Sequence, residues 1–426
     1  MQAIGITRDV TPLYPITSRR VRWFVVAALF GLSFASYMER MNLSVAAELM
    51  MPALSLTKSD LAAIFNSFLL GYAFFQVPAG WLGDRFGSRL VLGLSALAWG
   101  ILTVLSGMLP GVLSRTAVAT VVLLVTLRFL LGATEASTYP VAARAVHQWM
   151  VPERRGFGSS LMLMGSSVAS AFTAPFVSWS MLRFGWRASF YLTSMVAFAV
   201  GLLWLSFRQA PPASEQPAPV ASSPRQAGRW LNTNVVLLSL SYVSEGYLLF
   251  MFISWLYIYL VEVRGFSLAK GGPVAALPWL AAIAATPLGG FLSDRIAVRW
   301  GRIASARILI MAGYTSSGVL LLAAALVHAR PLAVLALCIS LGSLYVAESS
   351  FWTTAALIAG SDAGVVAGFM NTVGILGGVA STSIVPPLVE HYGYAGWIAA
   401  FSSGTAMGIF SAVLWWVLGR RLAKSA

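Results

Sequence analysis

Long, uninterrupted runs of apolar residues constrain this sequence more than any other feature. Only 10% of its 426 residues are charged and its mean hydropathy is +0.80, whereas a soluble domain carries about 25% charged residues. So few charges cannot cover a water-facing surface, which places the chain in a membrane. Because the apolar runs are continuous and do not alternate with polar residues, they predict an all-α integral membrane protein and speak against a membrane barrel.

The apolar runs predict twelve membrane spans, since each spanning helix needs about 20 apolar residues. The expected spans are residues 21–50, 59–82, 89–109, 116–146, 156–181, 188–207, 233–262, 268–293, 303–327, 331–359, 363–388 and 395–419.

The longest polar stretch, residues 208–232, is rich in Pro, Ala and Ser and is expected to be a flexible cytoplasmic linker. It separates two six-helix bundles, residues 21–207 and 233–419, and leaves tails at residues 1–20 and 420–426.

Basic residues are unevenly distributed between the two sides of these spans. With both termini in the cytoplasm, the inner segments hold 19 of the 28 Lys and Arg residues and the outer loops hold seven. Cytoplasmic loops of membrane proteins are enriched in these residues, so we expect cytoplasmic termini. The same rule accounts for the net charge of +14 without any binding of nucleic acid.

The motifs of several other functions are missing from the sequence. None of its three lysines lies in a phosphate-binding loop, and neither GxSxG nor HExxH occurs. The single cysteine, Cys338, excludes an intrachain disulfide and a cysteine metal cluster. We therefore expect no enzyme activity, no metal and no organic cofactor.

The two halves share a spaced pattern. The stretch GWLGDRFGSR (80–89) has a weaker counterpart in GGFLSDRIAVRWGR (289–302), and four pairs of identical residues are 210 or 211 positions apart. These pairs are Asp84 with Asp294, Gly158 with Gly368, Pro175 with Pro386, and Trp186 with Trp397. They indicate an internal duplication, and parallel six-helix repeats are a transporter architecture.

Six ionisable side chains fall within the predicted spans, where a charge is costly and commonly functional. They are Glu39, Arg40, Arg128, Glu135, Glu245 and Glu348. Arg128 and Glu135 are seven residues apart, nearly two turns, and should share a helix face. Two arginines in one cavity would form an anion site, because a guanidinium matches a carboxylate with two hydrogen bonds. The alternative is that each arginine only neutralises a buried acid.

The loop GWLGDRFGSR resembles the signature of the major facilitator superfamily. Three longer stretches resemble its anion:cation symporter branch, which includes bacterial sugar-acid permeases and vesicular glutamate and sialic acid carriers: YMERMNLSVAAELMMP (37–52), RFLLGATEASTYPVAARAVHQWMVPERRG (128–156) and FISWLYIYLVEVRGFSL (252–268). The resemblance implies two six-helix bundles related by a pseudo-twofold axis. The chain departs from the branch at Glu39, where Asp is common, and in WLYIYL (255–260), which lacks a proline.

The resemblance also implies roles for the charged residues. Arg40 and Arg128 would bind the anion and Glu135 would couple transport to protons, with Glu39 as a second proton site. Burial favours the neutral form of Glu135 and a nearby arginine favours its charged form, so an arriving anion could switch its protonation. A structural ion pair is the alternative for Glu39.

Neutral side chains complete the expected substrate site, because hydroxyl and amide groups suit a polyhydroxy acid. The candidates are Tyr37, Tyr72, Ser166, Trp255 and Asn371. Most aromatic residues of membrane proteins lie in the core or the interface belt, which is the alternative here. Glu245 and Glu348 could contact a substrate hydroxyl or cation, or hold the halves together.

A separate group is expected to form a cytoplasmic gate. It consists of Asp84, Arg85 and Arg89, with Asp294 and Arg295 in the second half. By resemblance, Asp84 meets the positive end of a helix in the other half and separates when the inner side opens. A basic loop that only sets topology is the alternative.

These features together predict a secondary transporter that takes up an organic anion, a sugar acid such as an aldonate, aldarate or hexuronate, by proton-coupled symport and alternating access. An antiporter that exports a drug or metabolite is the alternative, although it would not need two buried arginines. A non-transporting membrane sensor is a third possibility, but it should carry a sizeable soluble output segment, and we expect none in this sequence. Sodium coupling stays open. We expect a monomer in the lipid bilayer of a bacterial inner membrane.

Overall fold

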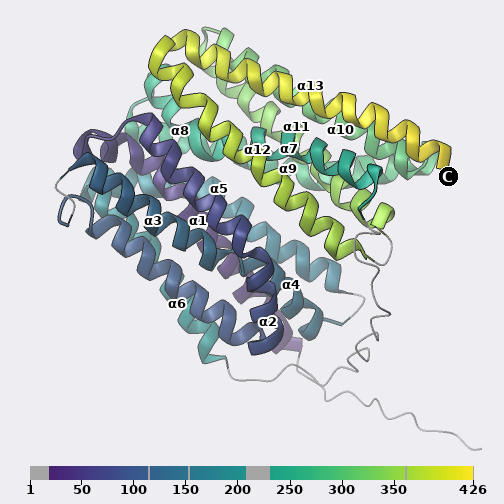
Figure 1. Ribbon diagram of the computed structural model, residues 1–426, viewed down its shortest axis with the longest axis horizontal. Coiled ribbons are helices and arrows are strands. Elements are labelled where there is room, and N and C mark those ends of the chain that lie inside the picture. Colours follow the sequence, from purple (N-terminus) through teal and green to yellow (C-terminus); the bar gives the residue numbers. More distant parts are fainter. Residues whose placement is uncertain (1–18, 114–115, 152–153, 208–230, 360–361, 426) are drawn as a thin grey trace, which may run out of the picture.

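The computed structural model describes residues 19–113, 116–151, 154–207, 231–359 and 362–425 (Figure 1). Most of the predicted linker and the first 18 residues of the predicted N-terminal tail lie outside the described residues. The helices of the first half are α1 (Arg19–Leu54), α2 (Lys58–Met108), α3 (Ala117–Glu135), α4 (Thr138–Trp149), α5 (Arg155–Phe184) and α6 (Trp186–Ser206). Those of the second half are α7 (Thr233–Phe250), the π-helical turn η2 (Met251–Trp255), α8 (Leu256–Ile258), the π-helical turn η3 (Tyr259–Val263), α9 (Leu268–Trp300), α10 (Arg302–Leu326), α11 (Arg330–Ala359), α12 (Ala363–Tyr392) and α13 (Tyr394–Ser425).

Eleven helical stretches of the described chain are long and apolar enough to cross a membrane. One of them, α2, has 51 residues and would measure about 76 Å as a straight helix, more than twice the roughly 30 Å of a bilayer core. Its backbone is non-helical at Gly87, with φ 80°, so α2 consists of two crossings that match the predicted spans 59–82 and 89–109. The described residues thus contain the twelve predicted crossings.

The two halves pack their helices in the same way. A methyl group at Gly165 of α5 would lie 2.4 Å from the Phe30 carbonyl oxygen of α1, and one at Gly377 of α12 would lie 1.9 Å from the Val243 carbonyl oxygen of α7. In each half the fifth crossing therefore touches the first at a glycine, which lets the two backbones approach closely. This shared contact agrees with the internal duplication.

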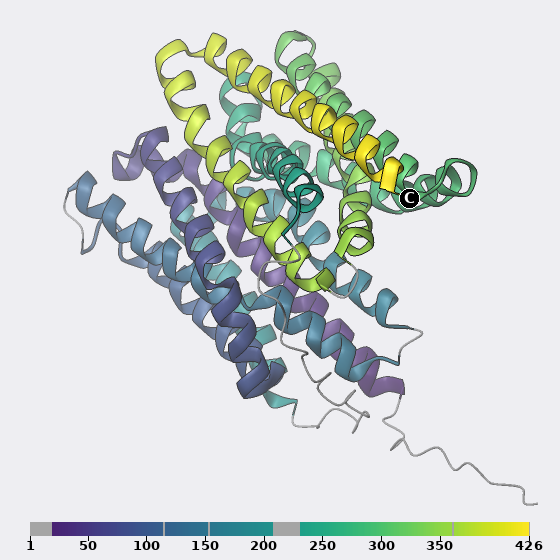
Figure 2. The same cartoon turned by 45° about the vertical axis from the view of Figure 1, so that its right-hand side comes forward.

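The two bundles lie side by side (Figures 1 and 2), the first coloured purple to blue and the second green to yellow. Where they meet, α5 contacts α9 and α2 contacts α12. We call the end of the bundle with the loops after α1, α5 and α12 the loop end, and the opposite end, where α1 begins and α13 finishes, the tail end. The Ser178 hydroxyl of α5 donates to the Leu268 carbonyl oxygen of α9 at the loop end.

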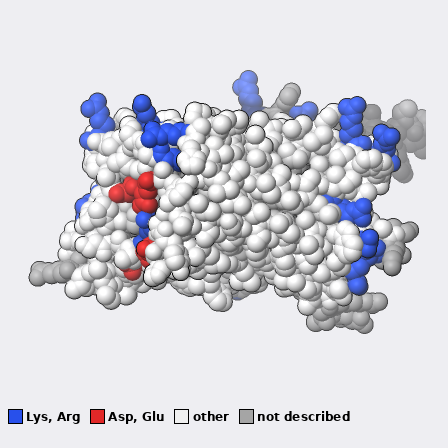
Figure 3. Space-filling model, turned by 90° about the horizontal axis from the view of Figure 1, so that it is seen from above, with Lys and Arg blue, Asp and Glu red and all other residues white. Residues whose placement is uncertain are grey.

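The surface has the distribution of charge that a bilayer requires. On the face in Figure 3, most charged side chains lie towards the left and right ends, and the broad centre is uncharged except for a basic side chain at its upper edge. Large apolar side chains such as Phe74 and Val77 are exposed. A contiguous apolar surface of this kind is costly in water, so this is a multi-pass membrane protein.

Candidate transport site

The fourth crossing is interrupted directly after Glu135. The helix α3 ends at Glu135 and α4 begins at Thr138. Pro140 lacks the N–H that would bond to the carbonyl oxygen of Ala136, which accounts for a discontinuity at this point. The Thr138 hydroxyl donates to the Glu135 carbonyl oxygen at 2.7 Å. The local sequence thus places the Glu135 carboxyl at a fixed break in the helix.

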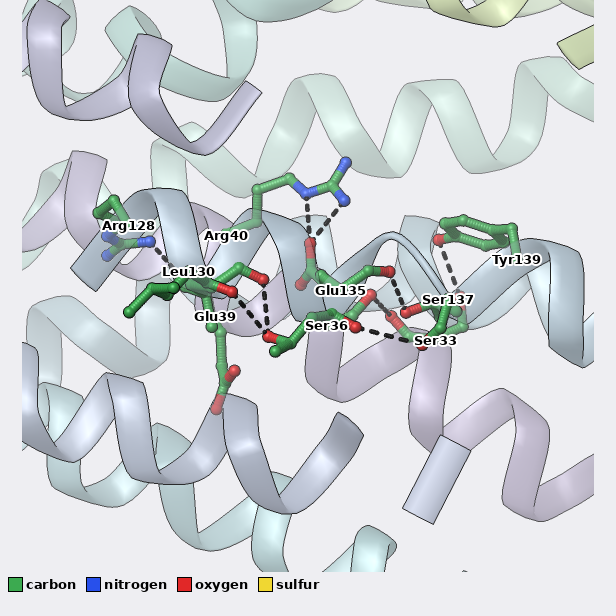
Figure 4. Close-up of polar contacts among 12 residues, drawn as sticks. Ser33, Ser36, Glu39, Arg40, Arg128, Leu130, Glu135, Ser137 and Tyr139 are labelled. Carbon is green, nitrogen blue, oxygen red and sulfur yellow. Dashed lines mark hydrogen bonds and ion pairs between the residues drawn. The ribbon is translucent and has the colours of Figure 1, made fainter. Parts of the chain in front are cut away.

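The Glu135 carboxylate forms an ion pair with Arg40 of α1 (Figure 4). Arg40 donates to the same oxygen, Oε2, through Nη2 at 2.7 Å and Nε at 3.2 Å. Glu135 is 0% exposed, whereas the Arg40 side chain is 9% exposed. The second carboxylate oxygen, Oε1, is buried and has no hydrogen-bond partner among the described residues.

Three aromatic rings surround the Arg40 guanidinium. Its central carbon lies 4.7 Å from the ring centroid of Tyr37, 4.9 Å from that of Phe68 and 5.0 Å from that of Tyr72. We call these three residues the aromatic box. Each ring attracts the cation through its negative face, so the box stabilises a charge that the membrane interior disfavours. Tyr37 and Tyr72 are among the predicted site residues, whereas Phe68 is not.

The second predicted arginine, Arg128, lies in the interior of the first bundle. Its Nη1 donates to the Glu39 carbonyl oxygen at 3.2 Å, and the residue is 3% exposed. The acidic group with the strongest electrostatic effect on it is Glu39, followed by Glu135. The Glu39 carboxyl points away from Arg40 (Figure 4) and, within the described chain, neither of its oxygens has a hydrogen-bond partner.

The two predicted arginines have different partners in this structure. Consecutive helical residues are about 100° apart around the axis, so Glu39 and Arg40 project from different sides of α1. Arg40 meets Glu135 inside the aromatic box, and Arg128 packs near Glu39 in the bundle interior. Of the two, Arg40 is half-buried and Arg128 is buried.

The aromatic box faces the second half of the chain. Tyr37 lies within electrostatic range of Glu245 and Tyr345, and Tyr139 lies within the same range of Tyr345. Next to the box, the hydroxyls of Ser33 and Tyr139 are 3.2 Å apart and hydrogen-bonded (Figure 4). The Arg40 site therefore lies where the two bundles face each other.

Two acids of the second half lie on the far side of this interface. Glu348 of α11 accepts hydrogen bonds from the hydroxyl of Tyr242 at 2.8 Å, the indole of Trp352 at 2.7 Å and the hydroxyl of Tyr314 at 3.4 Å. Glu245 of α7 lies within electrostatic range of Glu348. Three donors from the second half thus fix the Glu348 carboxyl.

The remaining pocket candidates differ in their surroundings. Trp255 is completely buried, and its ring meets Phe65 edge-on at 5.9 Å. Since Phe65 precedes Phe68 by about one turn, Trp255 lies on the loop-end side of the aromatic box. Ser166 donates to a carbonyl oxygen one turn earlier at 2.7 Å. Asn371 is partly buried, and no described residue forms a hydrogen bond with its side chain.

The predicted gate residues gather at the tail end. Asp84 forms an ion pair with Arg144 of α4, within its own half. Arg89 donates to the Leu205 carbonyl oxygen of α6. All five members of the group are exposed: Asp84, Arg85, Arg89, Asp294 and Arg295. In this structure Asp84 is thus bonded within the first half.

Comparison with known proteins places this geometry in a family. Residues 29–382 match the Major Facilitator Superfamily. The chain is 31% identical to the probable sulfoacetate transporter SauU of Cupriavidus necator, over 88% of this chain and 89% of that protein. It is 27% identical to the hexuronate transporter of Bacillus subtilis, over 89% and 92%, and 30% identical to the probable galactarate/D-glucarate transporter GudP of the same species, over 69% of each.

Solved structures share the fold. A bacterial homologue of the human lysosomal transporter Spinster, in an inward-facing and occupied conformation, matches with a TM-score of 0.72 at 18% identity, over 95% of this chain and 98% of that one. The POT family transporter PepTSo matches with a TM-score of 0.72 at 14% identity, over 96% of this chain and 99% of that one. The chain is therefore a membrane transporter, and it belongs to the Major Facilitator Superfamily.

Proposed function

We propose that this transporter takes up an organic anion, a sugar acid such as an aldonate, aldarate or hexuronate, together with protons. The observation that carries the proposal is the Arg40–Glu135 ion pair inside the aromatic box, at the interface of the two bundles. Relatives named as hexuronate and galactarate/D-glucarate transporters support the substrate class.

The ion pair provides a way to couple the two ions. Arg40 stays charged under nearly all conditions and can bind a carboxylate through two parallel hydrogen bonds. A substrate carboxylate that occupies Arg40 displaces Glu135, which is fully buried. A buried, unpaired carboxylate is costly, and it is neutralised by taking up a proton. The anion and the proton are then loaded together, and the halves rock around them.

The other polar groups have supporting roles in this proposal. Hydroxyls of the substrate meet Tyr37 and Tyr72 on one side and Glu245, Glu348 and Asn371 on the other. In the interior, Arg128 holds Glu39 in place, and Glu39 is the second proton site. An acceptor-rich wall opposite a single guanidinium suits a molecule with a carboxylate at one end and several hydroxyls along its length.

The orientation follows from the excess of Lys and Arg at the tail end. We propose that the tail end and both termini lie in the cytoplasm, and that the loop end faces outward. The bacterial sources of the named relatives favour a bacterial inner membrane. One chain contains the whole proposed site, so the active unit is a monomer.

Uptake into proteoliposomes tests this function. An inward proton gradient is imposed while hexuronates, aldonates, aldarates, aromatic acids and amino acids are screened as radiolabelled substrates. We expect one sugar-acid class to accumulate above its external concentration, and a protonophore to abolish the accumulation. Accumulation that requires a sodium gradient would overturn the proton coupling. Efflux of preloaded compound driven by an inward proton gradient would show antiport.

A further inference from the structure

At the loop end, two consecutive residues at the start of α2 contact the second half of the chain. Lys58 Nζ lies 2.9 Å from Glu262 Oε2 in η3. The backbone N–H of Ser59 donates to Glu390 Oε1 of α12 at 3.0 Å, and its hydroxyl donates to Oε2 at 2.6 Å. We call these four residues the loop-end latch. Each contact joins the first half to the second.

Glu390 acts as a helix cap supplied by the other half. The first N–H groups of a helix have no partner within it, and its N-terminus attracts negative charge. Thr57 and Asp60 already cap each other's backbone N–H groups, at 2.9 and 3.0 Å, in the same turn of α2. The Ser59 N–H takes no part in that exchange. It donates to Glu390 Oε1, while the Ser59 hydroxyl donates to Glu390 Oε2.

The contact belongs to a longer antiparallel seam between α2 and α12. Asn66 donates to Ser383 at 2.8 Å, and Thr372 donates to Gln76 at 3.4 Å. Asn66 lies seven residues after Ser59, and its partner Ser383 lies seven residues before Glu390. Gln76 lies 17 residues after Ser59, and its partner Thr372 lies 18 residues before Glu390. Continued to the tail end, this register sets Asp84 opposite positions 364–365, in the first turn of α12, which begins at Ala363.

The seam thus has a carboxylate at each end that can cap the partner helix. Glu390, near the end of α12, caps α2 in this structure, while Asp84 of α2 is bonded to Arg144 instead of to α12. A pocket of about 330 Å³ opens beside the latch and is lined by Lys58 and Glu262. Solvent at the loop-end surface can therefore reach the Lys58–Glu262 contact of the latch. Such access is expected of a contact that breaks during transport.

We propose that Glu390 is a positioning residue that controls which end of the transporter is open. By capping α2 from the opposite half, it stabilises the state with a closed loop end, and the loop end opens only when this cap is released. The inference rests on the alternating access of the proposed function, and it assigns to Glu390 a role separate from substrate and proton binding.

A distance measurement across the loop end tests this role without any substrate. In a Cys338→Ser background, spin labels are placed at Val112→Cys, between α2 and α3, and His328→Cys, between α10 and α11. Both positions are exposed and lie outside the latch. Glu390→Gln keeps the shape of the side chain and removes its charge. We expect it to raise the ratio of long to short label distances about tenfold, as the loss of a charge-assisted cap predicts.

Asp60→Asn is the matched control, because it weakens a cap of the same helix turn within one half. We expect its distance distribution to match that of the parent. Ser59→Ala removes the hydroxyl donor and keeps the backbone donor, so its ratio should rise about threefold. Ser59→Ala is also the variant that tests the proposal if the Glu390→Gln protein does not reach the membrane.

The proposal is overturned by an unchanged distribution in Glu390→Gln, by an unchanged one in Ser59→Ala, or by an equal shift in Asp60→Asn. Because no substrate or gradient enters the measurement, a failed uptake assay and a failed latch can be told apart.

Discussion

Arg40 and Glu39 are neighbours in α1 but have different environments. Arg40 is partly exposed inside the aromatic box and is bonded to Glu135, whereas Glu39 is fully buried beside Arg128. In the proposed mechanism the Arg40 pair must open to admit the anion. Arg128 has no such need: it donates to the Glu39 carbonyl oxygen in the interior of the first bundle.

Arg40→Lys tests the demand for a planar, forked cation. Lysine keeps the charge but cannot bind a carboxylate through two parallel hydrogen bonds or stack as well in the box. We expect the substrate Kd, measured by titration calorimetry, to rise at least about tenfold, a loss of about 1.4 kcal/mol. The control is Arg187→Lys, because Arg187 bonds to the Pro110 carbonyl oxygen at the loop end. Equal affinity in Arg40→Lys and wild type would remove Arg40 from the site.

Arg128→Gln should act on stability more than on specificity. It removes the hydrogen bond to the Glu39 carbonyl oxygen and the positive charge near the buried Glu39 carboxyl, and losing a hydrogen bond from a charged donor costs about 1.5–3 kcal/mol. Glu39→Gln in the same chain should recover part of this loss, because the neutral amide needs no nearby cation. Thermal unfolding of the four variants in detergent gives the double-mutant cycle. Additive losses would show that the two residues do not interact.

The residue types of the site could be predicted from the sequence, but their pairing could not. The search for ionisable residues at membrane depth yields six candidates, among them Arg40, Arg128 and Glu135. Which arginine meets which acid depends on how α1 and α3 are rotated about their axes, and spacing within one helix does not specify that. Phe68 could have been found, since it precedes Tyr72 by four residues and shares its helix face.

At the scale of elements, the seventh crossing departs most from a regular helix. It contains the π-helical turns η2 and η3, which place Trp255 and Glu262. The resemblance draws attention to the missing proline here, and the structure is irregular without it. A π-helical turn inserts one extra residue and rotates the side chains that follow. The hydrophobic periodicity of the sequence does not reveal where such an extra residue is inserted. The limits of the membrane spans, in contrast, can be predicted directly from the apolar runs.

Gly377→Ala tests the close packing of α7 and α12. The added methyl would lie 1.9 Å from a backbone carbonyl oxygen of α7, so the helices must separate. We expect a clear fall in the detergent melting temperature and a loss of transport. Gly368→Ala in the same helix is the control, since nothing lies within 4 Å of its methyl. Alanine favours helices over glycine by about 1 kcal/mol, so Gly368→Ala should be neutral or stabilising. Equal behaviour of the two variants would contradict the close contact.

At the scale of the whole molecule, the seam of α2 and α12 connects the two ends. If Glu390 caps α2 in one state and Asp84 caps α12 in the other, their losses should have opposite effects. Asp84→Asn should lower the fraction of long distances between labels at residues 112 and 328, measured with an anion bound so that both states are populated. A rise, as expected for Glu390→Gln, would contradict a reciprocal seam.

The central claim is that Glu135 carries the coupled proton while Arg40 carries the anion. The direct measurement compares two modes of transport in proteoliposomes containing Glu135→Gln. Counterflow exchange of labelled for unlabelled anion needs no net proton movement, and it should stay within about threefold of wild type because glutamine preserves the side-chain shape. Accumulation driven by an inward proton gradient should be lost, since glutamine cannot exchange a proton. Gradient-driven accumulation that persists in Glu135→Gln would contradict the account.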